Sequence, residues 1–223
     1  MTKILIIAPH PDDETLGCGG VLLRHRQQGD EVVWMLATGM CEEAGYSTRQ
    51  IEEREKVIQW VYKLYGFVEL IQLGFAPARL DTVPMGTIVS AIHEVVARVQ
   101  PGTIYLPYPG DAHTDHGVIF VAGSACTKWF RHPSVRRVLA YETLSETNQQ
   151  IRPDLGVFRP NHYVNIQTTL EEKMRILDVY AAELGSFPFP RSPEAIRALA
   201  QLRGSESGFH AAEAFMLLMD RVS

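Results

Sequence analysis

The sequence predicts an α/β fold with a Rossmann-like, mainly parallel sheet that helices cover on both faces. Over the first two thirds of the chain, short apolar, β-prone runs alternate with longer segments that repeat apolar residues at helical spacing. The first run, residues 4–8, is apolar throughout, which is typical of a strand buried on both faces. Strands separated by helices form βαβ units, and such units build parallel sheets.

Five strands are expected, each a run of apolar or β-branched residues bounded by turn residues. They are residues 4–8, 31–37, 67–73, 103–107 and 135–142. Right-handed crossovers place the carboxyl ends of the first and fourth strands on the same edge of the sheet. Any polar residues that follow these two strands are therefore expected to lie close together.

Helices are expected where apolar residues recur at helical spacing and glycine or proline ends the pattern, as at Gly66 and Pro101. The expected helices are residues 16–28, 49–65, 85–99, 118–130, 170–184, 193–203 and 211–222. The last third of the chain is thus predicted to be helical. Residues 184–193 hold three prolines and indicate an ordered loop. We find no repeat or linker, and we expect residues 1–223 to form a single domain.

Composition narrows the class of partner and the compartment. The formal net charge of -5 argues against nucleic acid and anionic membrane surfaces, which reward clustered Lys and Arg. Cys18, Cys41 and Cys126 lie far apart without CxxC spacing, which indicates free thiols in a reducing compartment. No apolar stretch approaches the roughly 18 residues of a membrane span. The sequence therefore predicts a cytoplasmic protein with a small-molecule partner.

The loop after the first strand concentrates charge. Residues 9–14 read PHPDDE and place three carboxylates and an imidazole directly after a buried strand. That grouping is electrostatically costly unless a cation lies among them, and ligands of open α/β sheets bind at this edge. An acidic loop that caps the next helix is the alternative, and Glu14 could serve only that purpose. A helix-capping role for this loop does not explain why it also contains His10.

A second polar loop follows the fourth strand. Residues 108–117 read YPGDAHTDHG, in which His113 and His116 flank Asp115. A lone loop histidine is most often a surface residue, but two His/Asp clusters at one sheet edge are a common source of metal ligands. The two loops together predict a divalent metal site.

The two strings resemble the paired signature of the PIG-L or LmbE-like deacetylase family. APHPDDE at residues 8–14 is the more specific motif, and HTDH at residues 113–116 is the shorter one. Leu73 with Gly74, and Gly208 with AEAF at 212–215, extend the resemblance over nearly the whole chain. The resemblance implies a zinc-dependent hydrolase that removes an acetyl group from an N-acetylglucosamine-type sugar or sugar conjugate. It is also compatible with a homo-oligomer of unspecified size.

The resemblance assigns a metal set by position. His10, Asp13 and His116 match the three zinc ligands of the family, which implies one Zn²⁺ per chain with Fe²⁺ or another divalent ion as the alternative. Three protein ligands leave a position open for water and substrate, as a catalytic zinc site requires.

The resemblance also implies three catalytic roles. Asp12 matches the general base that deprotonates the attacking water. His113 matches the residue that stabilises the oxyanion or protonates the leaving amine, and Asp115 is placed to orient that imidazole.

Two departures from the family pattern leave the substrate open. Residues 76–81 read APARLD where many relatives have Asp-Gly. Arg54 fits the substrate-binding arginine of the family, but Val57 stands where a glutamate is usual. A non-sugar amide therefore remains an alternative substrate. Arg191 and the aromatic residues are further pocket candidates; the latter are Tyr108, Trp129, Phe187 and Phe189.

Other classes of protein are less well supported. A metal-dependent phosphoesterase would need two metal ions about 4 Å apart with basic residues nearby. In a non-catalytic sugar- or nucleotide-binding domain, Asp12 would not be needed beside Asp13, because binding alone does not require a general base. The glycine-rich run at 17–20 lacks the G-x-G-x-x-G order of a dinucleotide loop, and no G-x-S-x-G elbow is present.

Overall fold

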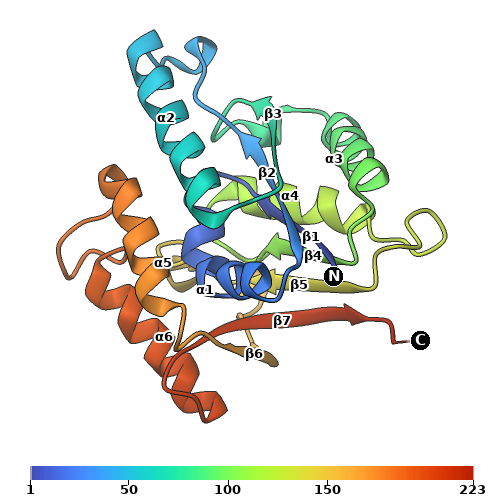
Figure 1. The fold of residues 1–223 in the computed structure, drawn as a ribbon. Coiled ribbons are helices and arrows are strands. Elements are labelled where there is room, and N and C mark those ends of the chain that lie inside the picture. Colours follow the sequence, from blue (N-terminus) through green and yellow to red (C-terminus); the bar gives the residue numbers. More distant parts are fainter. Residues whose placement is uncertain (1, 223) are drawn as a thin grey trace.

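The computed structural model describes residues 2–222, which form one seven-stranded sheet with helices on both faces (Figure 1). The strands are β1 (Lys3–Ala8), β2 (Glu31–Thr38), β3 (Glu69–Phe75), β4 (Thr103–Pro107), β5 (Arg137–Tyr141), β6 (His162–Asn165) and β7 (Ala212–Asp220). The helices are α1 (Asp13–Gln27), α2 (Thr48–Tyr65), α3 (Met85–Val99), α4 (Thr114–Ala125), α5 (Leu170–Leu177) and α6 (Pro193–Ser207). None of these described helices is long and apolar enough to cross a membrane.

The strand order is β3-β2-β1-β4-β5-β7-β6. Strands β1 to β5 run parallel, and β7 runs antiparallel to both of its neighbours. The predicted α/β class with a mainly parallel, Rossmann-like sheet is therefore confirmed. The crossover from β3 through α3 returns the chain to the other side of β1, where β4 pairs with β1 in parallel, so the loops that follow β1 and β4 share one edge.

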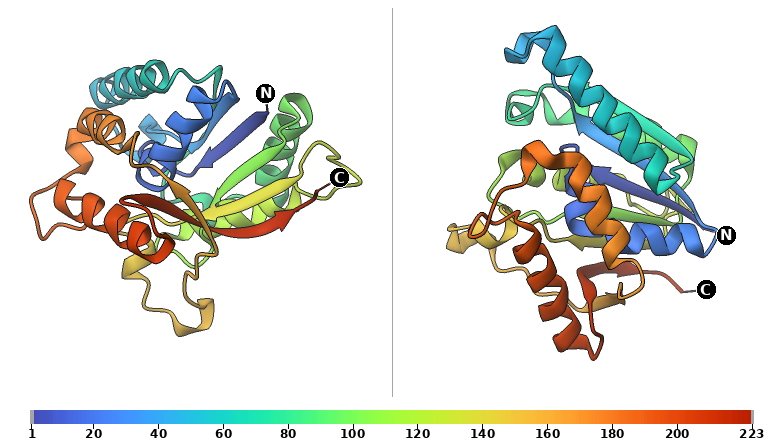
Figure 2. Two further views of the ribbon diagram at one scale, coloured as in Figure 1. Left: turned by 60° about the horizontal axis from the view of Figure 1, so that its bottom comes forward. Right: turned by 60° about the vertical axis from the view of Figure 1, so that its left-hand side comes forward.

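The continuous apolar run of β1 explains why helices cover both faces of the sheet. Ile4 and Ile6 pack on the face covered by α1, α2 and α5, whereas Leu5 and Ile7 pack on the face covered by α3 and α4. Figure 2 shows these two helical layers on either side of the sheet. Each successive side chain of a strand points to the opposite face, so a continuous apolar run serves two cores at once.

The prediction for the C-terminal third was partly wrong. Residues 211–222, expected to be a helix, form strand β7, and the short strand β6 was not predicted. Alanine, leucine and methionine in this segment favour helix on their own. Pairing with β5 on one side and β6 on the other overrides that preference. The helix expected at 170–184 ends at Leu177 and continues as a 3-10 segment, Asp178–Glu183.

The glycine-rich run of α1 serves close packing. A Cβ atom on Gly17 would lie 2.4 Å from Cδ2 of Tyr141, and one on Gly20 would lie 2.6 Å from Cγ2 of Ile166. Neither distance is tolerable for a real side chain, so β5 and the segment after β6 can approach α1 only because these positions are glycine. The run lies inside a helix and forms no phosphate-binding loop.

A buried ion pair fastens α5 to β7. Nζ of Lys173 lies 2.8 Å from Oε1 of Glu213, and both side chains are almost fully buried. Lys173 also donates to the backbone carbonyl of Leu16, while Glu213 accepts the backbone N–H groups of Gly20 and Val21. The pair thus joins α5 and β7 to each other and to α1.

Replacing Lys173 with methionine is expected to lower the free energy of unfolding by about 3–5 kcal/mol, because Glu213 is left buried without its cation. Urea unfolding measured by circular dichroism checks this. Arg49→Ala is the control, since it removes an exposed ion pair with Glu53 and should leave the unfolding midpoint essentially unchanged. A Lys173→Met midpoint equal to that of the control would contradict the importance of the pair.

Candidate active site

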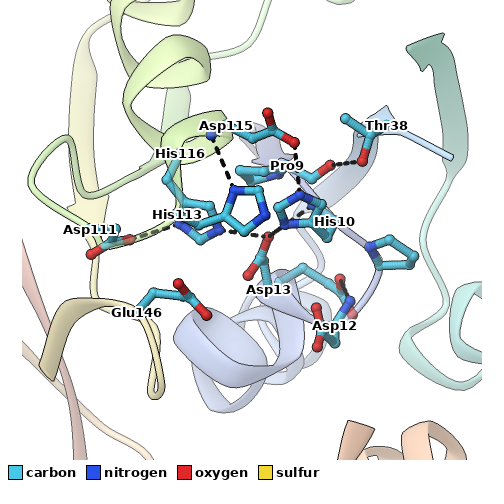
Figure 3. Close-up of polar contacts among 12 residues, drawn as sticks. Pro9, His10, Asp12, Asp13, Thr38, Asp111, His113, Asp115, His116 and Glu146 are labelled. Carbon is cyan, nitrogen blue, oxygen red and sulfur yellow. Dashed lines mark hydrogen bonds and ion pairs between the residues drawn. The ribbon is translucent and has the colours of Figure 1, made fainter. Parts of the chain in front are cut away.

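The two polar loops meet at the carboxyl edge of the parallel sheet. The first leaves β1 and leads into α1, and the second leaves β4 and leads into α4. Figure 3 shows that side chains of both loops point toward one another. Five of the residues expected to form a metal and catalytic site are brought together here: His10, Asp13, His113, Asp115 and His116.

The geometry of His10, Asp13 and His116 is that of a metal-binding group. Nδ1 of His10 lies 3.2 Å, and Nε2 of His116 lies 3.3 Å, from Oδ2 of Asp13. These three residues each offer a ligand atom within 4.8 Å of the others, and His113 with Asp115 forms a second such group around His10. Nε2 of His116 is buried and, despite its nearness to Asp13, has no partner in hydrogen-bond geometry. A buried ring nitrogen that has no hydrogen-bond partner and lies beside a carboxylate is suited to coordinate a cation.

Electrostatics at this group also favour positive charge. Burial alone would lower the pKa of His10, but hydrogen bonds to Asp115 and Asp13 raise it to about 9. Burial likewise opposes the charged form of His116, and the Asp13 carboxylate overcomes it and raises its pKa. The pKa of Asp13 is lowered: burial opposes this, but the His116 charge and the His10 hydrogen bond are stronger. The carboxylates around His10 and His116 therefore stabilise positive charge at the place where a divalent metal ion would bind.

Two aspartates fix the orientation of the two histidines. Oδ2 of Asp111 lies 2.7 Å from Nδ1 of His116, and Oδ2 of Asp115 lies 3.1 Å from Nε2 of His10. Each contact occupies the ring nitrogen that faces away from Asp13, as outer carboxylates do around metal-bound imidazoles. Asp111 was not among the site residues predicted from the sequence. The only sequence feature that could have indicated it is its position in the same loop, five residues before His116.

The Asp115 carboxylate was expected to orient His113, but in the structure it contacts His10. It also accepts backbone N–H groups of Ala78 (2.8 Å) and Leu80 (3.2 Å). His113 instead accepts the backbone N–H of Asp115 at Nδ1 over 3.1 Å, which caps α4. The loop at residues 76–81 therefore contributes to the site through its backbone N–H groups.

Asp12 has a strained backbone beside this group. Its φ of 145° lies in a region that favours glycine, and such strain costs on the order of 1–3 kcal/mol and gathers at functional sites. Its backbone N–H donates to the buried Glu14 carboxylate (3.2 Å), and its own carboxylate accepts from Nη1 of Arg191 (3.2 Å). Burial and the charge of Asp13 raise the pKa of Asp12. Glu14, which the sequence left as a possible helix cap, supports this turn.

A cavity of about 330 Å³ opens above the metal-binding group. Asp12, His10, Asp13, His113 and His116 lie in its lining. The predicted substrate residue Arg54 also lines it. Its guanidinium pairs with Glu183 and lies 3.4 Å from the backbone carbonyl of Pro11.

Other cavity residues were hidden from the sequence or were misjudged. Glu183 and Glu146 lie in the lining, and neither is predicted from the sequence, because both come from segments distant from the motifs. Arg191 also lines the cavity. The aromatic candidates do not: Tyr108 lines a separate hollow, and the others, Trp129, Phe187 and Phe189, are exposed outside the lining.

Fold and site together define a Rossmann-like α/β protein that carries a His/Asp metal-binding group and a buried carboxylate at the carboxyl edge of its sheet. The sequence profile of the PIG-L family, described as GlcNAc-PI de-N-acetylase, matches residues 5–127. This is more than half of the chain, and the chain therefore belongs to the PIG-L family.

Individual relatives agree with this membership. Diacetylchitobiose deacetylase from Thermococcus kodakarensis is 24% identical over 222 residues, which cover 95% of this chain and 81% of the relative. The conserved protein TT1542 from Thermus thermophilus superposes with a TM-score of 0.79 at 25% identity, over 100% of this chain and 97% of that one. Family and relatives identify the chain as a deacetylase, and hence a hydrolase.

The same fold also carries a different reaction. The 4-carboxy-2-hydroxymuconate hydratase GalB from Pseudomonas putida KT2440 superposes with a TM-score of 0.78 at 16% identity, over 100% of this chain and 98% of that one. A likeness at that identity concerns the fold alone. The family membership, and not this likeness, carries the deacetylase assignment, and the substrate of this chain has to be inferred from its site.

Proposed function

We propose that this protein is a zinc-dependent hydrolase that removes the N-acetyl group of an N-acetylglucosamine-type sugar or sugar conjugate. The observation that carries the proposal is the His10, Asp13 and His116 group with the buried Asp12 carboxylate beside it, in one cavity. The substrate class is the one named for the Thermococcus relative, a diacetylchitobiose deacetylase.

The donor set suits zinc. His10, Asp13 and His116 offer two imidazoles and one carboxylate, and three protein ligands leave room for substrate. When bound, zinc supplies Lewis-acid chemistry that polarises an amide carbonyl and acidifies water. Asp111 and Asp115 hold the two imidazoles in place for that ion.

Asp12 serves as the general base in this proposal. Its carboxylate lies in the cavity next to Asp13, and Arg191 holds one of its oxygens at 3.2 Å. A raised pKa brings a carboxylate closer to neutral pH, where a base accepts protons from water most effectively.

His113 serves as the donor to the developing oxyanion. Its Nδ1 accepts the backbone N–H of Asp115, so in the neutral ring the proton belongs on Nε2. Burial, followed by the charge of His10, lowers the pKa of His113 and favours that neutral form. The Nε2–H group can then donate a hydrogen bond to the amide oxygen, while the proton that Asp12 takes from water is available to the leaving amine.

The test is acetate release from a panel of N-acetylated sugars and sugar conjugates, with and without a chelator. Release that stops with chelator and returns with added zinc is expected. A metal-loaded protein that releases no acetate from any member of the panel would contradict the sugar substrate and point to another amide.

The phosphoesterase alternative finds less support in the geometry. The two candidate metal groups share His10 instead of forming separate positions. The two arginines at the cavity are engaged, Arg54 by Glu183 and Arg191 by Asp12. Phosphate would have to displace these pairs.

A further inference from the structure

Two walls of the cavity each carry a glutamate, and the two glutamates differ in whether an arginine pairs with them. On the wall formed by α2 and residues 183–191, Glu183 pairs with Arg54 and lies 3.8 Å from Arg191. The opposite wall, at the end of β5, carries Thr143 and Glu146. Within residues 2–222 no basic side chain pairs with the Glu146 carboxylate, in contrast to Glu183.

The Thr143 hydroxyl is buried and has no partner. Thr143 is 1% exposed, and its Oγ1 makes no hydrogen bond although it belongs to a residue lining the cavity. Its backbone is fully engaged: the N–H donates to Oγ1 of Thr147, and the carbonyl accepts the N–H groups of Glu146 and Thr147. Buried hydroxyls almost always have a partner, so the unused one points to a ligand.

Glu146 is held in place but not neutralised. Its Oε1 accepts the Ser145 hydroxyl at 2.9 Å, and its backbone carbonyl accepts the N–H of Ala112. The next residue, Thr147, donates to Oδ1 of Asp111 over 2.5 Å. Figure 3 shows the Glu146 side chain directed toward the histidine and aspartate cluster. The turn is thus braced on the loop that positions His116, and its carboxylate is preorganised at the cavity.

We propose that Thr143 and Glu146 form a subsite that binds a ring hydroxyl of the sugar next to the scissile acetamide. The inference rests on the proposed sugar substrate and assigns its orientation: the hydroxyl faces the β5 wall, and the acetamide faces Asp12 and His113. The Glu146 carboxylate accepts a hydrogen bond from the sugar hydroxyl, and the Thr143 hydroxyl supplies one further contact.

The experiment is an NMR-detected titration of N-acetylglucosamine and of glucosamine into wild type, Thr143→Val, Glu146→Ala and Glu146→Gln. Glu146→Ala is expected to weaken binding of both sugars roughly tenfold to a hundredfold, as for a lost hydrogen bond to a charged group, and Thr143→Val by about twofold to tenfold, as for a neutral one. Because an amide oxygen also accepts from a hydroxyl, Glu146→Gln is expected to retain most of the binding.

Sugar binding, bound metal and acetate release are each measured, so that failure of the subsite and failure of the proposed function can be told apart. Glu94→Ala, an exposed glutamate on α3, is the matched control and should bind both sugars as wild type does. Unchanged binding of both sugars by Thr143→Val and Glu146→Ala would overturn the subsite, and so would loss of bound metal in Glu146→Ala. Repeating the titrations with Asp12→Asn, which is expected to bind without turnover, separates binding from hydrolysis, so sugar binding with no acetate release by metal-loaded wild type would defeat the proposed function and not the subsite.

Discussion

Replacing Asp12 with asparagine is expected to lower kcat for acetate release by about 10²–10⁴-fold, the usual contribution of a general base. The amide keeps the size of the side chain and still accepts from Arg191, but it cannot take a proton from water. The metal-binding atoms of His10, Asp13 and His116 are untouched by the change. The variant should therefore be folded and loaded with metal, yet nearly inactive.

Metal content and kcat measured on the same preparation check this expectation. Asp154→Asn, at an exposed aspartate that pairs with the exposed Arg152 away from the cavity, is the matched control and should keep full activity. Substantial turnover by the metal-loaded Asp12→Asn protein would remove Asp12 from the role of base.

His116→Ala is expected to lose the metal itself and, with it, activity. His116 is fully buried, and its unpartnered Nε2 faces the Asp13 carboxylate. Asp111→Asn should give a graded effect. It keeps a hydrogen-bond acceptor beside Nδ1 of His116 but removes the charge, and such outer-carboxylate changes typically weaken metal affinity about 10–100-fold.

Competition with a chelator of known affinity measures both variants on one scale. His210→Ala removes an exposed histidine of the same chain and should leave the affinity unchanged. Full metal occupancy in His116→Ala would exclude this residue as a ligand, and an affinity of Asp111→Asn equal to that of wild type would deny Asp111 its orienting role.

The sequence predicted the site well wherever chain order determines space. A buried strand followed by PHPDDE, and a second followed by YPGDAHTDHG, could be placed side by side because parallel crossovers bring β1 and β4 together. Apolar runs that alternate with helical segments were enough to predict the five parallel strands of the sheet. The membership of the family followed from the same two strings.

The failures have physical causes that no local pattern reveals. Strand β7 carries residues that favour helix, and only pairing with β5 and β6 makes it a strand. The contact of Asp115 with His10 spans 105 positions, and the Glu146 and Glu183 positions depend on how distant segments pack around the cavity. A cytoplasmic location and a homo-oligomer stay predictions.

The most direct test of the account is a metal titration of the chelated protein that follows acetate release from an N-acetylated sugar. The account predicts no release by the metal-free protein and a return of activity that reaches its plateau at one zinc ion per chain. Full activity in a preparation shown to contain no metal would contradict it.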